Sequence, residues 1–129
     1  MWSRTFTHPD TGCTVEIADD GRGAWAFLRD PAGDIIGDVW LYNRVAPPQQ
    51  LDLTRSELAP FLNPLSLARP LEGPLPSRAQ LDVRWTMTDE VLLADVLVRE
   101  ALLARLSPGT QPGWNTLAVC DGPLALVLT

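Results

Sequence analysis

The sequence predicts an α+β domain in which one mostly antiparallel sheet of about six to seven strands packs against a single long helix. Three observations support this fold class. The first half of the chain alternates apolar and polar residues between turn motifs, as a strand meander does. Residues from about 88 to 106 form an apolar stretch long enough for a buried helix. The last residues surround an Asp-Gly turn, which is typical of a hairpin.

The length and composition fit one domain, residues 1–129. Of the 129 residues, 46% are hydrophobic and 20% are charged, as in ordinary globular domains. The chain lacks a run of about 18 apolar residues, so no transmembrane helix is expected. No apolar signal core follows the first residues, and a cytoplasmic location is therefore expected.

The N-terminal half predicts a four-stranded meander. Asp19-Asp20-Gly21 and the segment 30–34 supply turn residues between the alternating stretches. Gly37 lies inside the longest stretch and indicates a bulge or the close approach of another backbone. The expected strands are Trp2–Thr7, Cys13–Ala18, Ala24–Arg29 and Ile35–Asn43.

The middle of the chain is rich in proline. Seven of the 12 prolines fall between Pro47 and Pro76, which disfavours continuous sheet or a long helix there. The capping-box pattern from Thr54 to Glu57 predicts a short helix that Pro60 limits, although a further turn could follow. The segment Asn63–Ser77 is expected to be an ordered, proline-rich surface loop.

The long helix is expected at about Thr88–Leu106, after a strand at Leu81–Thr86. Acidic residues in its first turn would face the positive end of the helix dipole, and Pro108-Gly109 would end it. Asp95 and Arg99 would form an i,i+4 pair. The apolar side chains do not form one stripe, so the sheet and either the proline-rich segment or a second protein must cover this helix.

The C-terminal residues predict a hairpin. Asp121-Gly122 is a strong two-residue turn signal. The flanking stretches Asn115–Cys120 and Pro123–Thr129 would be its strands. Pro123 would then lie at a strand start, where a missing amide donor is tolerated.

The charge balance limits the partners that the protein can bind. Sixteen acidic and 10 basic residues give a formal net charge of -6, and all the basic residues are arginines. Binding to nucleic acid or to an anionic membrane needs clustered cations, so neither is expected. An acidic surface suits a basic protein partner, although the charge could also serve solubility alone.

The sequence offers little chemistry for catalysis or metal binding. His8 is the only histidine, and Cys13 lies five residues after it; a loop histidine and a buried cysteine explain the pair better than a nucleophile and its base. His8, Asp10 and Cys13 lack the further ligands of a metal site. A disulfide between Cys13 and Cys120 would require that their strands meet. We therefore expect no catalytic residues, no metal and no cofactor.

Carboxylates and aromatic residues share one expected strand. Asp34 and Asp38 would lie about 13 Å apart in an extended strand, too far for a retaining glycosidase pair unless a bulge at Gly37 shortens the distance. Asp38, Trp40 and Tyr42 alternate and would share one face. That face is either a protein interface or is buried under the helix. Trp114 is either an exposed anchor or a plug over the helix end.

The stretch Gly37-Asp38-Val39-Trp40-Leu41-Tyr42-Asn43-Arg44, after a short-turned meander, resembles the small immunity proteins encoded beside bacterial polymorphic toxins. The resemblance is one of general character: a short, acidic, aromatic-rich chain without catalytic residues. It implies that an acidic, aromatic face inhibits one cognate toxin by binding its basic active-site cleft. The partner-binding residues expected on this basis are Asp34, Asp38, Trp40, Tyr42, Asn43 and Trp114.

Two other classes of protein remain open at this stage. A secretion-system chaperone would form a homodimer through the apolar helix and hold an extended effector segment, although such chaperones usually begin with a helix. A small enzyme or ligand-binding domain would hold its ligand between the helix and the sheet.

Overall fold

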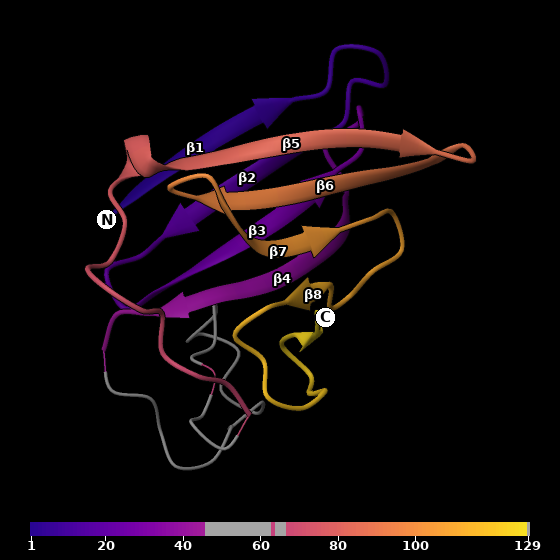
Figure 1. Cartoon of the computed structure of the whole chain (residues 1–129). Helices are drawn as coiled ribbons and strands as arrows, with labels where there is room; N and C mark the ends of the chain where they lie inside the picture. Colours follow the sequence, from indigo (N-terminus) through magenta and orange to yellow (C-terminus); the bar gives the residue numbers. More distant parts are fainter. Residues whose placement is uncertain (46–62, 64–66, 129) are drawn as a thin grey trace.

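Two β-sheets face each other in this protein (Figure 1). The computed structural model describes residues 1–45, 63 and 67–128. The N-terminal sheet has the strand order β1-β2-β3-β4, with β1 (Trp2–Thr7), β2 (Thr14–Asp19), β3 (Gly23–Arg29) and β4 (Ile35–Asn43). The C-terminal sheet has the order β5-β6-β7-β8-β9, with β5 (Leu81–Thr88), β6 (Val91–Val98), β7 (Ala101–Leu106), β8 (Trp114–Asn115) and β9 (Leu126–Val127).

The N-terminal meander agrees with the sequence prediction. All three strand pairs are antiparallel, and each strand lies within a residue or two of its expected position. Gly21 and Gly33 occupy the turns with φ of 87° and 93°, a conformation that glycine adopts without steric cost. The burial of β2 alternates along the strand, as its sequence pattern requires.

The predicted long helix over Thr88–Leu106 is wrong, and with it the α+β fold class. This stretch forms the end of β5, the strands β6 and β7, and two tight turns. The apolar residues that would have surrounded the expected helix belong to strands. Along β6, the side chains at every second position are buried: Leu92, Ala94, Val96 and Val98. In the described part of the chain, the helical structure is a 3-10 helix, η2 (Arg78–Gln80).

The two turns explain why the periodicity was misread. Asp89-Glu90 joins β5 to β6 and Arg99-Glu100 joins β6 to β7, and all four residues have positive φ. Such turns usually carry glycine or asparagine, so the sequence gives no hairpin signal there. The expected Asp95–Arg99 pair does not form, because Asp95 binds Arg105 across β6 and β7.

The single sheet and the C-terminal hairpin are also corrected. Nine strands of the described residues divide into two sheets, and β8 and β9 run parallel to each other instead of forming a hairpin. Asp121 accepts a hydrogen bond from the amide of Val127, which closes a longer loop than the Asp-Gly turn predicts. The short helix expected from Thr54 lies outside the described residues. In the proline-rich stretch, Ala68 forms an isolated bridge with Ala118.

The core lies between the two sheets. One hydrophobic cluster joins buried residues of both sheets, including Val15, Ile17 and Leu28 from the first and Val96 and Leu106 from the second. The second sheet therefore covers the first, which is the role the sequence assigned to a helix. A sandwich of this kind buries one face of each sheet and leaves the other face outside.

Backbone hydrogen bonds join the two sheets along one edge. Segments from the second half of the chain form hydrogen bonds with the edge of β4. The amide of Asp38 donates to the carbonyl of Thr110, and the amide of Trp40 donates to the carbonyl of Leu124. The buried side chain of Asn115 also donates to the carbonyls of Trp40 and Leu41. This edge of the N-terminal sheet is thus covered, which removes a free strand edge.

Side chains join the other pair of edges, β1 and β5. Nη1 of Arg4 donates to the carbonyls of Leu81, at 2.7 Å, and Arg78, at 3.2 Å. Nε of Arg78 donates in return to the carbonyl of Ser3. Further along, His8 packs against Trp85 with ring centroids 5.2 Å apart. Arginine and aromatic side chains therefore hold together two strands that do not pair through their backbones.

Candidate protein-binding face

A β-bulge separates the aromatic residues that the sequence placed on one strand face. In the pairing of β3 with β4, Trp25 faces Trp40 and the next residue, Ala24, faces Tyr42, so Leu41 has no partner. A bulge of this kind reverses the direction of the side chains that follow it. Trp40 therefore lies on the outer face of the N-terminal sheet, whereas Tyr42 points into the core.

Tyr42 has a structural role and is not available to a partner. It is 0% exposed, and its hydroxyl donates a 2.9 Å hydrogen bond to Oδ2 of Asp19. Arg44 donates to the same oxygen, and the amide of Gly21 donates to Oδ1. Burial, followed by the hydrogen bond to Asp19, raises the pKa of the Tyr42 phenol far above its ordinary value. The prediction that Tyr42 contacts a partner is therefore not supported by its position.

Trp40 is likewise buried, although it lies on the outer face of its sheet. Its indole Nε1 donates to Oδ1 of Asn43 at 2.8 Å, and the side chain is 1% exposed. Asn43 in turn holds the backbone of Asn63, accepting from its amide and donating to its carbonyl. Trp40 and Asn43 thus form one hydrogen-bonded unit that fixes local structure and offers no free anchor.

Asp38 is the predicted residue with the most unusual environment. It lies on the outer face beside Phe27, its register partner on β3, and its side chain is half-buried. No side chain among the described residues donates a hydrogen bond to its carboxylate or forms an ion pair with it. Burial alone raises the pKa of Asp38, and no compensating charge lowers it. The carboxylate of Asp38 is therefore partly removed from water without a compensating cation among the described residues.

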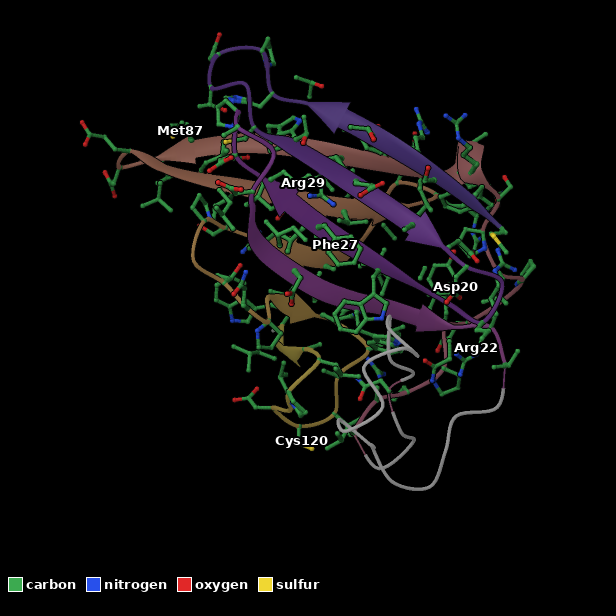
Figure 2. All side chains as sticks on the ribbon, turned by 180° about the vertical axis from the view of Figure 1, so that it is seen from behind. Asp20, Arg22, Phe27, Arg29, Met87 and Cys120 are labelled. Carbon is green, nitrogen blue, oxygen red and sulfur yellow. The ribbon has the colours of Figure 1, made fainter. Side chains whose placement is uncertain are left out.

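The neighbours of Asp38 are already paired with each other. Arg29 forms an ion pair with Glu16 at 3.3 Å, and its Nη1 donates to the carbonyl of Gly33. Phe27 stacks on Trp25 with ring centroids 6.2 Å apart. Figure 2 shows Phe27 and Arg29 on the outer face of this sheet. The acid therefore has an aromatic side chain beside it, while the nearest strand arginine is held elsewhere.

Asp34 lies in the turn between β3 and β4, away from Asp38. It is exposed, and its amide donates to a carboxylate oxygen of Asp30. A second register irregularity, near Ile35, lies between the two carboxylates. Because Asp34 has an ordinary turn geometry and is exposed, we treat it as a surface charge and not as part of the half-buried environment of Asp38.

Trp114 lies on the outer face of the C-terminal sheet, next to its register partner Arg105. It is half-buried, and it does not cover a helix end, because residues 88–106 form strands and tight turns. Arg105 is fixed by Asp95, to which Nε donates at 2.7 Å and Nη2 at 3.1 Å. The hydrogen bond to Asp95 raises the pKa of this guanidinium. A shallow groove of about 310 Å³ is lined by Leu93, Arg105, Trp114, Val127 and Leu128.

The covered edge of β4 joins these two regions. The amide of Gly113 donates a 2.7 Å hydrogen bond to the carbonyl of Asp38, and Trp114 follows directly. We call the set Phe27, Asp38, Arg105 and Trp114 the seam face: the first two lie on the outer face of the N-terminal sheet and the other two on that of the C-terminal sheet, on either side of the seam. Of the six predicted partner-binding residues, Asp38 and Trp114 lie on either side of this seam, each on the outer face of its own sheet, and Asp34 lies in the turn that precedes β4.

Sequence reasoning missed Phe27 and Arg105. Phe27 alternates with Trp25 along β3, and this spacing could have placed both rings on one face. Arg105 could not have been found in this way, because it was assigned to the end of a helix. Its pairing with Trp114 depends on β7 and β8 being neighbours, which no local pattern reveals.

The residues considered for catalysis lie apart from the seam face. Nδ1 of His8 is 2.8 Å from the hydroxyl of Thr11, and the two cysteines are not joined, since Cys13 is buried and Cys120 is exposed. Within residues 1–45, 63 and 67–128, no group of three or more His, Cys, Asp or Glu side chains could hold a metal ion.

No family model, curated protein or solved structure matches this chain. Among the described residues, no helix has the length and apolar character needed to cross a membrane.

Proposed function

We propose that this protein is a small protein-binding domain of the immunity class, which inhibits a cognate bacterial toxin by direct contact through the seam face. The observation that carries the proposal is the state of Asp38: half-buried, beside Phe27, and without a cationic partner among the described residues. A Lys or Arg side chain of a basic toxin would supply the missing charge.

The environment of Asp38 favours a carboxylate that is paired with a cation over one that stays unpaired. Removing a carboxylate from water without a partner is unfavourable, and a folded protein alone gains nothing from it. When a partner brings an opposite charge into a partly desolvated site, the interaction is stronger than at an open surface. The geometry therefore supports a bound state in which the unfavourable burial of Asp38 is offset.

The other half of the seam face supports an interface for a different reason. Trp114 is a large, partly exposed aromatic residue beside a groove with apolar walls. Buried Trp and Arg residues contribute most to the affinity of typical interfaces. Arg105 is already held by two hydrogen bonds to Asp95, so little side-chain entropy is lost when a partner packs against it.

The net charge of -6 supports a basic partner and fast association. The chaperone alternative loses its main argument, because the apolar helix expected to form a dimer interface is a pair of strands. The ligand-binding alternative loses the expected space between helix and sheet for the same reason.

A growth test examines the proposal directly. Each product of a gene adjacent to the one for this chain is expressed in a bacterial host, with and without the chain. We expect one product to arrest growth and the wild-type chain to relieve the arrest. Asp38→Lys should fail to relieve it, and Asp34→Lys, the matched charge reversal at an exposed site of the same hairpin, should retain protection.

Folding of both variants is checked by near-ultraviolet circular dichroism. Two results would overturn the proposal: no adjacent product arrests growth, or a folded Asp38→Lys protein protects as well as the wild type. Loss of protection by Asp34→Lys as well would show that net charge, and not the seam face, determines binding.

A further inference from the structure

The hairpin of β5 and β6 extends beyond the rest of the molecule. Its turn projects past the ends of the neighbouring strands in both views, and the side chain of Met87 lies close to the tip (Figures 1 and 2). Met87 and Val91, which flank the turn, are each 49% exposed. Their register partners are Leu92 and Thr88, so the two apolar side chains lie on opposite faces of the hairpin.

The turn at this tip adopts a conformation that its residues do not favour. Asp89 has φ of 50° and Glu90 has φ of 65°, in a two-residue turn where asparagine and glycine are the preferred residues. For a residue with a Cβ atom the left-handed conformation is unfavourable, and glutamate lacks the short side chain that helps asparagine there. Folding alone would favour different residues at these positions.

The turn between β6 and β7 provides an internal comparison. Arg99 and Glu100 have nearly the same geometry, with φ of 49° and 72°. That turn is attached to the body of the protein, because the amide of Arg99 donates to the carbonyl of Gln80 at 2.9 Å and its guanidinium reaches the Gln80 side chain. By contrast, no side chain among the described residues pairs with Asp89 or Glu90.

We propose that the β5–β6 hairpin is an insertion arm that enters a basic, apolar-rimmed cleft of the protein partner. Asp89 and Glu90 meet cationic side chains inside the cleft, and Met87 and Val91 pack against its two walls. The placement of apolar residues on both faces of the hairpin fits a cleft and does not fit a flat surface. This inference rests on the proposed binding of a basic toxin and assigns the part of the chain that reaches its active site.

The outer face of the hairpin continues into the seam face. Val91 is followed on the same side of β6 by Leu93, which lines the groove beside Trp114. A partner that holds the tip in its cleft can therefore contact Trp114 with its rim. One binding event would use both surfaces, and the arm would act as the inhibitory element.

The test uses the growth-arresting product of the adjacent gene, purified as a catalytically inactive variant, and measures its association with this protein by biolayer interferometry. Glu90→Asn is compared with Glu100→Asn, which removes the same charge from the second position of the equivalent turn. We expect Glu90→Asn to slow association about tenfold at low salt and to weaken its salt dependence. Glu100→Asn should leave both unchanged.

Thermal unfolding separates this effect from damage to the fold. Since asparagine tolerates positive φ better than glutamate, both variants should be at least as stable as the wild type. Equal association by Glu90→Asn and the wild type would overturn the insertion arm while leaving the seam face intact. Equal slowing by both variants would reduce the effect to net charge and would also overturn the arm. If the wild type does not bind the product, the arm and the proposed function are both wrong.

Discussion

Tyr42 donates a hydrogen bond to Asp19 although a whole strand separates them. Asp19 is on β2 and Tyr42 on β4, and Ala24 of β3 is the register partner of both. The small side chain of Ala24 lets the phenol pass over β3 and reach the carboxylate. The contact spans three strands at the end of the sheet, where Arg44 completes it.

Tyr42→Phe tests the value of this contact. The variant removes a donor from a carboxylate that is 1% exposed and keeps the ring that fills the core. We expect the free energy of unfolding to fall by about 1.5–3 kcal/mol, as for a hydrogen bond to a buried charge. Urea unfolding followed by tryptophan fluorescence measures it; an unchanged midpoint would show that Arg44 and Gly21 suffice to satisfy Asp19.

Asp38→Asn should stabilise the isolated protein at neutral pH. Burial raises the pKa of Asp38 above its ordinary value of 3.8, so the charged form is disfavoured in the folded state. The stability of the wild type relative to the variant is therefore greatest below pH 3.8 and falls as the pH rises through the raised pKa. Thermal unfolding of both proteins from pH 3 to 7 measures this; parallel curves would contradict the assignment.

Gly113→Ala should be strongly destabilising for reasons of space. An added Cβ would overlap the backbone carbonyl oxygen of Arg105, well inside van der Waals contact, and would press against Leu106 and Val39. Because the edge of β4 is held there by hydrogen bonds, the backbone has little room to shift, and we expect a cost of about 3 kcal/mol. Gly109→Ala is the comparison, since it has open space but φ of 90°, and should cost about 1–2 kcal/mol. Chemical denaturation would refute this order if Gly109→Ala cost more.

Arg4→Met should loosen the contact between β1 and β5. Methionine keeps much of the aliphatic stem but loses the hydrogen bonds to Leu81 and Arg78 and the guanidinium over the ring of Phe6. We expect a loss of about 1–2 kcal/mol and faster amide exchange in β1 and β5 than in β3. Arg29→Met, which breaks a more exposed ion pair, should cost less than about 1 kcal/mol. Uniformly faster exchange in Arg4→Met would rule out a local role.

The strands of the N-terminal sheet could be predicted from the sequence because the patterns that define them are local. Alternation along β2 and the glycine turns at Gly21 and Gly33 define each strand without reference to distant residues. Even there, the bulge opposite Ala24 and Trp25 was not predicted, so Tyr42 was expected to share a face with Asp38 and Trp40, whereas it lies on the opposite one. A single inserted residue reverses the direction of every side chain that follows it, and no residue type at Leu41 predicts a bulge there.

The C-terminal half was misread because its turns lack turn residues. Glu90, Arg99 and Glu100 are good helix formers, and the two turns join strands whose Leu and Ala residues also favour helix. Tertiary packing decides the conformation, since the N-terminal sheet needs a second sheet to cover it. The seam face depends on the same packing, which is why Asp38 could be proposed from its strand while the backbone contact between Asp38 and Gly113 could not.

Each sheet is built from strands that follow one another in the chain, and the sheets meet only through their faces and edges. Most backbone pairings therefore close short loops. Closing a short loop costs little conformational entropy and is fast. Contacts such as Asn115 with Trp40 and Arg4 with Leu81 join residues more than 70 positions apart, and their loop-closure entropy is the largest to overcome. The seam between the two sheets therefore depends on the contacts that close the longest loops of the chain, whereas each sheet rests on short ones.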